Sequence, residues 1–353
     1  MIKELIQRVV DGKDLSHLEA QAVMKELMSG NATNAQIASF LTALRMKGES
    51  VEEISAFAEV MRDFCFKIHP NVNKRIIDIV GTGGDRIKSF NVSTTASFIV
   101  AGASVVVAKH GNRSFTSKCG SADLLEKLGY NLDTEPSIVE KSIEKIGIGF
   151  MFAPRFHQAM KYALEPRREI GIRTVFNILG PITNPANVSG YLLGVCERRL
   201  TRLMAFVLKN LGSEEAMVVH GLDGLDEIST IGKTEIAWLK RGKISVMEIS
   251  PKDFGVRLAK QDEIEVSNPE ESVEIVFKIL NGLYAKGDPK MDMALVNAAC
   301  GIVVGGLTDK FDEAMELAYE SIRSGAAYNK LKAMIKLCKG SMEKLEELEV
   351  KFG

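Results

Sequence analysis

The chain has 353 residues, with 45 Lys and Arg against 46 Asp and Glu, so its formal net charge is −1. At roughly 150 residues per domain this length favours about two domains, and the balanced charge argues against a nucleic-acid binder, which typically carries a basic excess. Hydrophobic residues make up 46% and charged residues 26%, and these globular proportions exclude a disordered or coiled-coil chain.

The first 72 residues are predicted to form a small helical domain. Three pairs at the capping-box spacing mark helix starts: Ser16 with Glu19, Thr33 with Gln36, and Ser50 with Glu53. Gly12, Gly30 and Gly48 lie where the preceding helices should end. Short helices with one apolar stripe each must pack on one another or on a partner. We therefore expect this region also to form the subunit contact of a homodimer.

After Pro70 the pattern changes to alternating strands and helices. Short β-branched runs predict strands at 76–80, 104–108, 148–153, 191–196 and 216–220, with helices at 92–101 and 199–211 among them. This alternation is typical of a largely parallel α/β sheet, whose ligands bind at the carboxyl ends of the strands. The loops after Val80, Ala108 and Val219 should therefore carry the chemistry. The tail beyond Pro269 is predicted to be mostly helical and without chemistry.

The loop after the first strand is rich in glycine: GTGGD at 81–85, followed by SFNVSTT at 89–95, which opens a helix. Glycines let backbone amides approach an anion closely, and the helix N-terminus adds free N–H groups and a partial positive charge. Asn91, Ser93 and Thr94 should add side-chain hydrogen bonds there. The pattern is neither a Walker loop nor the GxGxxG fingerprint. An ordinary glycine-rich turn with polar caps is the alternative.

The second loop concentrates positive charge. Lys109, Arg113 and Lys118 lie within ten residues, and no acid occurs before Asp123. This composition suits a multiply anionic ligand such as phosphate or pyrophosphate. Ser121 is predicted as the N-cap of a helix at 123–128, which would make a second anion site. The alternative is a plain loop followed by a cap.

The third loop, HGLDGLDE at 220–227, carries three carboxylates. The adjacent Asp226 and Glu227 can hold a hard cation through oxygen. Magnesium takes one or two carboxylates and completes its shell with water and substrate phosphates. An EF-hand is excluded because its twelve-residue ligand spacing is missing. On this motif alone, a solvated acidic loop remains the alternative.

Together the loops imply a phosphate-rich substrate held by glycine amides and cations, with magnesium held by the acids. The segments GTGGD, NVSTT, KHGNRS, GSAD and FNILGPITNP, in this order, resemble the anthranilate phosphoribosyltransferase family over essentially the whole chain. The resemblance implies a small α domain and a large α/β domain with a mostly parallel central sheet, the fold of pyrimidine nucleoside phosphorylases. We expect the domains at 1–72, with a helical return near 160–190, and at 73–353.

The resemblance also implies the reaction and its ligands. The family transfers the phosphoribosyl group of 5-phosphoribosyl 1-pyrophosphate (PRPP) to the amino group of anthranilate, the second step from chorismate to tryptophan. Magnesium, as two ions per subunit, would be held by Ser93, Asp226 and Glu227, and anthranilate by Gly81, Asn112 and Arg167. PRPP would be bound by residues of the first two loops: Gly81, Gly84, Asp85, Ser89, Asn91, Val92, Ser93, Thr94, Lys109, His110, Gly111, Asn112, Arg113, Ser114, Phe115, Thr116, Ser117 and Ser121.

Arg167 lies in EPRRE, where the family usually has an apolar residue before the arginine and Lys after it. Pro166 and Arg168 depart from that pattern, and Cys119 stands where Ser is commoner; none of these changes removes a charge. The basic stretch from Arg167 to Arg173 should return across the helical domain toward the loops.

We expect the protein mainly to position the substrates and neutralise the leaving pyrophosphate, while the anthranilate nitrogen attacks from the opposite face. No residue is assigned as general acid or base. His110 is the candidate for proton transfer, but shaping the anthranilate site is the favoured role for it. His17, His69 and His157 are expected to be structural.

Two other functions remain open. A pyrimidine nucleoside phosphorylase would share the fold, but the KHGNRS loop and the Asp226–Glu227 pair speak against it. A non-enzymatic nucleic-acid binder is disfavoured by the neutral net charge and the intact acid pair.

The chain is expected in the cytoplasm. The apolar run at 98–108 is shorter than the ~18 residues that a membrane span requires, and the charged start lacks a signal-peptide cleavage site. The cysteines are odd in number and form no CxxC, which indicates neither a disulfide framework nor a zinc cluster: Cys65, Cys119, Cys196, Cys300 and Cys338.

Overall fold

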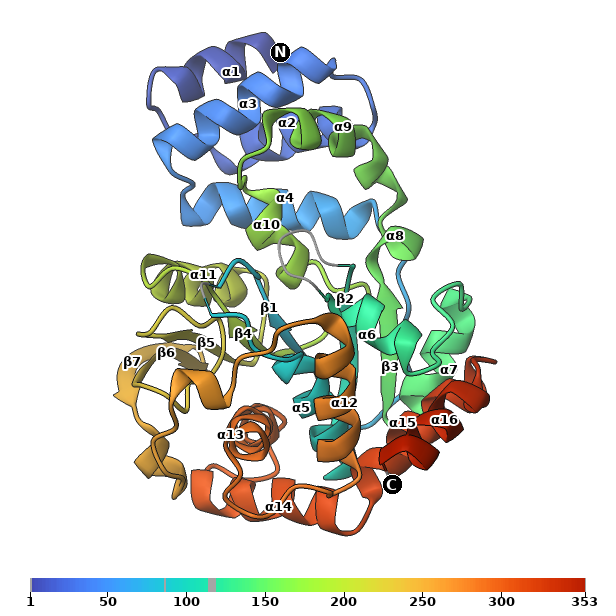
Figure 1. Ribbon diagram of the computed structural model, residues 1–353. Helices are drawn as coiled ribbons and strands as arrows, with labels where there is room; N and C mark the ends of the chain where they lie inside the picture. Colours follow the sequence, from blue (N-terminus) through green and yellow to red (C-terminus); the bar gives the residue numbers. More distant parts are fainter. Residues whose placement is uncertain (1, 86, 114–118, 353) are drawn as a thin grey trace.

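The computed structural model describes residues 2–85, 87–113 and 119–352. Its N-terminal helices and its C-terminal helices lie at opposite ends, with a β-sheet between them (Figure 1). The N-terminal helices are α1 (Ile2–Val10), α2 (His17–Met28), α3 (Asn34–Lys47) and α4 (Val51–Asp63). The three predicted capping boxes are present at the starts of α2, α3 and α4. Helix α9 (Lys161–Ile170) returns to pack against α2 and α3 (Figure 1).

The sheet has seven strands in the order β3-β2-β1-β4-β5-β6-β7. Their bounds are β1 (Ile76–Gly81), β2 (Val106–Gly111), β3 (Ile148–Phe152), β4 (Gly190–Gly194), β5 (Glu215–Gly221), β6 (Thr234–Lys240) and β7 (Lys243–Ile249). The first five strands pair in parallel, whereas β6 and β7 add an antiparallel hairpin. The sequence did not predict this hairpin. Its turn, Arg241–Gly242, has positive φ at both residues, which fits the tight two-residue connection of a hairpin.

The second strand begins and ends later than predicted. It covers Val106–Gly111 instead of 104–108, so Lys109 and His110 belong to the strand and not to the loop after it. Ser104 has a φ of 74° and lies in the turn that leads into the strand. The apolar run therefore located the strand but not its end, because the strand continues through two polar residues that are buried in the fold.

Helices cover both faces of the sheet: α5 (Val92–Gly102), α6 (Ser121–Lys127), α7 (Pro136–Ile146), α8 (Ala153–Phe156), α10 (Phe176–Leu179), α11 (Arg199–Asn210), α12 (Pro269–Leu280), α13 (Pro289–Val304), α14 (Phe311–Arg323), α15 (Ala326–Leu337) and α16 (Met342–Phe352). Alternate strand residues point to opposite faces. Ile77, Ile79 and Val107 pack with α5 and α13, while Ala108 and Leu193 pack in a core that continues into the N-terminal helices. The predicted fold class, a small N-terminal helical domain with a larger, mostly parallel α/β domain, is confirmed.

Across the three described stretches of chain, no helix combines the length and the apolar character that a bilayer crossing demands.

Candidate functional site

The carboxyl ends of β1, β2 and β5 border a cavity of about 570 Å³. Every predicted site residue that the structure describes lines it: Gly81, Gly84, Asp85, Ser89, Asn91, Val92, Ser93, Thr94, Lys109, His110, Gly111, Asn112, Arg113, Ser121, Arg167, Asp226 and Glu227. Four further predicted residues, Ser114, Phe115, Thr116 and Ser117, lie outside the described residues.

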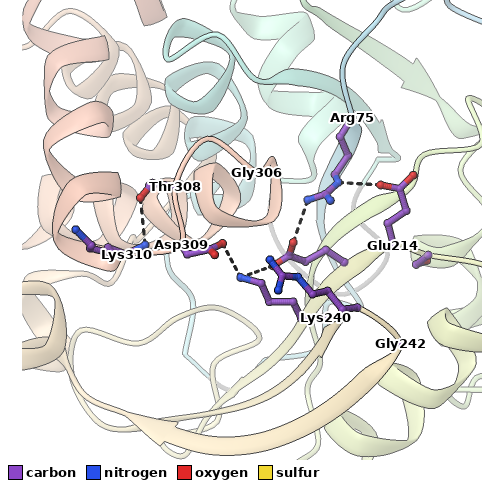
Figure 2. Close-up of a pocket in the computed structure, with 11 residues that line it drawn as sticks. Arg75, Glu214, Lys240, Gly242, Gly306, Thr308, Asp309 and Lys310 are labelled. Carbon is purple, nitrogen blue, oxygen red and sulfur yellow. Dashed lines mark hydrogen bonds and ion pairs between the residues drawn. The ribbon is translucent and has the colours of Figure 1, made fainter.

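A wider cleft of about 720 Å³ lies at the amino ends of β1 and β5 (Figure 2). Several of its charged side chains form ion pairs with one another. Arg75 bonds to Glu214 at 3.3 Å and to Glu215 at 3.0 Å, and Lys240 lies 2.6 Å from Asp309. Ligands of parallel sheets bind at the carboxyl ends of the strands, whereas this cleft lies at the amino ends. The 570 Å³ cavity is therefore the candidate site.

Two glycines make room for the first acid of the site. Gly81 at the end of β1 pairs with Gly194 of β4, and Asp226 lies over this pair. A Cβ on Gly81 would come within 2.5 Å of Asp226 Oδ2, and a Cβ on Gly194 would overlap the Asp226 carbonyl oxygen. Asp226 Oδ2 accepts a hydrogen bond of 2.8 Å from the Gly83 amide. We call Gly81 and Gly194 the glycine notch, because their missing side chains seat Asp226.

Three acids of the cavity carry unfavourable buried charge. Burial raises the pKa of Asp226 above its ordinary value. Burial also raises the pKa of Glu227 well above its ordinary range, and the neighbouring Asp226 raises it further. Asp85 is affected in the same way, since burial and then Asp226 raise its pKa to about 7. Clustered acids of this kind are stabilised when a cation binds among them.

The donor set at these acids fits magnesium shared with a substrate. Glu227 Oε1 accepts a hydrogen bond of 3.2 Å from the Ser93 amide, which places the Ser93 side chain beside the carboxylates at the start of α5. Within the described residues no group of three or more His, Cys, Asp or Glu side chains forms a metal cage. Magnesium usually takes only one or two carboxylates and leaves the rest of its shell to water and phosphate oxygens. The residues present therefore fit this ion.

Lys109 brings a positive charge up from the sheet. Its side chain is 3% exposed, and its Nζ donates to the Ile79 carbonyl at 2.7 Å and to Ser93 Oγ at 3.5 Å. Burial lowers its pKa, while the negative charges of Asp78 and Glu227 oppose that shift. The aliphatic part of the side chain thus lies in the core, and the ammonium group reaches the side of the cavity that holds Ser93 and Glu227.

His110 lies next to Lys109 and is almost fully buried. Its Nδ1 lies 3.2 Å from the Gly180 carbonyl oxygen, and its ring centroid is 5.0 Å from that of His157. Nε2 of each ring is buried without a hydrogen-bond partner among the described residues. Burial lowers the pKa of His110 to about 3 and that of His157 to about 4. Both imidazoles are therefore neutral near pH 7.

Part of the cationic loop is neutralised from the following helix. Arg113 makes ion pairs of 2.8 Å with both Asp123 and Glu126 of α6. The stretch without acids predicted more unpaired positive charge than the structure has, because Asp123 and Glu126 on the helix form ion pairs with Arg113. The predicted N-cap role of Ser121 is wrong. Helix α6 begins at Ser121 itself, and Gly120 is the N-cap, with its amide bonded to Asp123 Oδ2 at 3.0 Å.

Asn91 is held by the C-terminal part of the chain. It is the N-cap residue of α5 but makes no side-chain cap hydrogen bond, which speaks against the alternative of a glycine-rich turn with a simple polar cap at this residue. Instead its Nδ2 donates to the Cys119 carbonyl at 3.1 Å, and its Oδ1 accepts from Ser272 Oγ at 2.9 Å. Ser272 lies on α12 and lines the cavity. The tail beyond Pro269 thus contributes a side chain to the cavity lining, which its sequence pattern did not indicate.

The segment after α8 brings two arginines to the cavity from the helical side. Arg167 on α9 has its guanidinium carbon 5.2 Å from the centroid of the Phe176 ring, and burial lowers its pKa. Arg173 follows α9, and its Nη2 donates to the Thr82 carbonyl at 3.1 Å. The sequence placed Arg173 in a stretch returning toward the loops but gave it no role. The signal that could have found it is Gly84, where a side chain would overlap the Arg173 guanidinium.

Comparison with known proteins places the chain in a family. A model described as "Glycosyl transferase family, a/b domain" matches residues 73–328, and the corresponding helical bundle domain matches residues 3–65. The anthranilate phosphoribosyltransferase of Alkaliphilus metalliredigens is 49% identical over 337 residues, covering 96% of this chain and 98% of its own. That of Geobacter sulfurreducens is 49% identical over 350 residues, covering 96% and 99%.

Solved structures agree with this placement. The anthranilate phosphoribosyltransferase of Thermus thermophilus has a TM-score of 0.89 and 36% identity, covering 95% of this chain and 99% of its own. The Saccharomyces cerevisiae enzyme, solved in complex with PRPP and Mg, has a TM-score of 0.87 and 28% identity, covering 96% and 98%. With these matches spanning both domains, the chain belongs to the anthranilate phosphoribosyltransferase family of glycosyl transferases.

Proposed function

We propose that the 570 Å³ cavity carries out the reaction of this family. The phosphoribosyl group of PRPP is transferred to the amino group of anthranilate, giving N-(5-phosphoribosyl)anthranilate and pyrophosphate, the second step of tryptophan biosynthesis from chorismate. One observation carries the proposal: the glycine-rich loop, the basic strand end and the acidic loop meet in one cavity, where Asp226 is hydrogen-bonded to Gly83.

The phosphates of PRPP are assigned to the first two loops. The glycine-rich turn at 81–84 lets the pyrophosphate approach the backbone closely, and the start of α5 adds a partial positive charge. The Gly83 and Ser93 amides are themselves bonded to Asp226 and Glu227. Lys109 adds charge from the sheet side, and Arg113 adds a guanidinium whose charge is shared with α6. The other assigned residues of the cavity, from Asp85 and Ser89 to Ser121, complete this set.

Magnesium is assigned to Ser93, Asp226 and Glu227, as two ions per subunit. The raised pKa values of the two carboxyl groups and the oxygen-only donor set support this assignment. The complex of the yeast relative with PRPP and Mg supports it as well. When bound, magnesium neutralises charge on the leaving pyrophosphate.

Anthranilate is assigned to Gly81, Asn112 and Arg167. Its carboxylate needs a planar cationic partner, and a guanidinium provides one. With the carboxylate held, the amino nitrogen faces the ribosyl carbon on the side opposite the pyrophosphate, so attack inverts the anomeric centre. The protein contributes orientation and charge neutralisation as the oxocarbenium character develops. No residue is assigned as general base: burial lowers the pKa of His110 to about 3, which makes this imidazole a weak proton acceptor, and the proton of the nitrogen is assigned to solvent.

The domain division and assembly belong to the same proposal. We assign residues 1–72, with the return near 160–190, to the helical domain and residues 73–353 to the catalytic domain. The hydrogen bond of 2.9 Å from Asn34 to Glu165 ties that return to the N-terminal helices. Two copies pair through the helical domain and leave each cavity within one chain. We place the protein in the cytoplasm, where its five free cysteines remain reduced.

A fluorescence assay tests the function. Anthranilate fluorescence should fall only when PRPP and magnesium are both present, and pyrophosphate should appear in equal amount. Loss of anthranilate without PRPP, or phosphorolysis of a pyrimidine nucleoside in place of this reaction, would contradict the proposal.

A further inference from the structure

Arg173 connects the helical side of the molecule to the glycine-rich loop. Helix α9 ends at Ile170, its C-cap Gly171 has a φ of 66° that turns the chain, and Arg173 follows two residues later. Its Nη2 donates to the Thr82 carbonyl at 3.1 Å. The guanidinium thus reaches from a segment packed on α2 and α3 to the loop that follows β1.

Loop and guanidinium fit each other closely. Gly84 has a φ of 87°, which side-chain-bearing residues rarely adopt, and a Cβ there would overlap Nη1 of Arg173. The bond at Thr82 and the close approach at Gly84 place the guanidinium directly against the turn of the loop. We therefore expect the shape of this loop to depend on Arg173.

Arg173 also balances the acids of the cavity. Its guanidinium lines the same cavity as Asp85 and Asp226 and brings a positive charge to it from the helical side. Lys109 enters the cavity from the sheet, where its Nζ lies 3.5 Å from Ser93 Oγ. The acids are thus held between two cations that come from different parts of the chain.

The same segment carries the residue assigned to anthranilate. Arg167 lies six positions before Arg173, and both line the cavity. Just after Arg173, the Thr174 amide donates to Asn177 Oδ1 at 2.9 Å, and Asn177 lines the cavity too. A ligand that orders the glycine-rich loop therefore also orders the segment that carries Arg167, because Arg173 joins that segment to the loop.

We propose that Arg173 is a positioning residue that couples the two substrate sites: it holds the glycine-rich loop in place for the pyrophosphate group and makes anthranilate binding tighter when that group is bound. This inference rests on the proposed function. Coupling of this kind is reciprocal, so each ligand raises the affinity for the other by the same factor.

The test compares Arg173→Ala, Arg173→Lys and Gly84→Ala with the wild-type protein and with Arg168→Ala. Arg168 is an exposed guanidinium on the same segment and serves as the matched control. Steady-state kinetics give kcat and the KM of each substrate. Anthranilate titrations, with and without magnesium pyrophosphate as a non-reacting probe, give the coupling factor.

In the wild-type protein, magnesium pyrophosphate should tighten anthranilate binding several-fold. In Arg173→Ala the KM for PRPP should rise about ten-fold or more, as for loss of a charge-assisted contact, and the coupling factor should fall to one. Gly84→Ala should lose the coupling with the arginine still present, because the added methyl displaces the guanidinium. Arg173→Lys should recover part of it, and Arg168→Ala should match the wild type.

Wild-type binding that is insensitive to magnesium pyrophosphate would overturn the inference. So would an Arg173→Ala variant that keeps the coupling, or one that loses only kcat with both KM values unchanged. If Arg173→Ala fails to fold, Arg173→Lys and Gly84→Ala decide the question. Failure of the proposed function would look different, because the wild-type protein itself would then not consume anthranilate.

Discussion

The carboxylate of Asp226 and the backbone amide of Gly83 are joined by a hydrogen bond of 2.8 Å across 143 positions of sequence. The bond ties the acidic loop after β5 to the glycine-rich loop after β1, so the two behave as one unit of the site. Asp226 has two separable properties there, its charge and its acceptor oxygen. Substitutions of Asp226 that remove the charge alone, or the charge together with the acceptor oxygen, separate the contributions of these two properties.

Replacing Asp226 and Glu227 together by Ala should abolish magnesium-dependent turnover and leave the fold intact. The cost should fall on PRPP, whose pyrophosphate shares the ion. Asp226→Asn is the matched control: it keeps an acceptor oxygen for Gly83 but loses the buried charge, so its Tm should be at least that of the wild type, and it should still respond poorly to magnesium. Turnover against magnesium concentration, with melting curves, measures both effects. An unchanged magnesium dependence in the double variant would remove this loop from the site.

Asp85 should make the ligand-free protein less stable as the pH rises. Its folded-state pKa of about 7 lies above the ordinary value of 3.8, so the folded protein binds more protons between these values. The stabilisation is complete below about pH 4 and is lost as the pH rises through about 7. Compared with the wild type, Asp85→Asn should flatten the fall in Tm between about pH 5 and pH 8. Identical pH profiles of Tm would mean that Asp85 ionises normally.

Arg167→Ala should raise the KM for anthranilate about ten-fold or more, since a charge-assisted contact is worth about 1.4 kcal/mol or above. The KM for PRPP should move far less, because its assigned ligands lie on the other loops. Steady-state kinetics with each substrate varied in turn measure the split. Equal effects on both substrates would indicate that Arg167 orders the whole site, and no effect on anthranilate would mean that another group holds its carboxylate.

His110→Asn should leave the shape of the pH–rate profile unchanged. With a pKa lowered to about 3 by burial, the imidazole stays neutral across the working range and contributes no titration near its ordinary pKa. The amide keeps one polar group beside Gly180, so the loss in kcat/KM should be uniform with pH. A limb near pH 6.5 in the wild type that vanishes in the variant would establish proton transfer by His110.

Light scattering should give about twice the chain mass of 38.7 kDa for the intact protein. The helical domain carries apolar side chains that stand far out of the surface, with Leu18 77% and Met46 84% exposed. Replacing both with Glu should give monomers. Val350→Glu, at an 89% exposed site near the other end of the chain, is the control and should remain dimeric. A monomeric wild-type protein at micromolar concentration would count against this contact.

Local patterns in the sequence predicted the elements well where local forces decide them. The capping boxes at Ser16, Thr33 and Ser50 involve residues three apart, and all three are formed. The start of β1 at Ile76 and of α5 at Val92 were likewise predicted. The loops that line the cavity could be named because each follows a buried strand directly.

What the sequence could not predict depends on distant partners. The sequence pattern predicted Lys109 and His110 in a loop, but both are buried in β2. The negative charges of Asp78 and Glu227 compensate the burial of Lys109, and the Gly180 carbonyl is the partner of His110. The contacts of Asn91 with α12 and of Arg113 with α6 join residues whose partners no local pattern identifies. The hairpin of β6 and β7 was missed because β7 is a mostly exposed edge strand, whose burial gives little apolar signal.

The glycine notch makes the site depend on sheet register. Gly81 and Gly194 are partners across β1 and β4, so both gaps face Asp226 only when these strands pair as they do. If β4 shifted by one residue relative to β1, a residue with a side chain would replace Gly194 opposite Gly81. The side chains of the shifted strand would also move to the opposite face of the sheet. A chain with one residue inserted in β4 could still build a sheet, but Asp226 would have no seat on it. In this fold, correct strand alignment and assembly of the acidic part of the cavity are thus a single event.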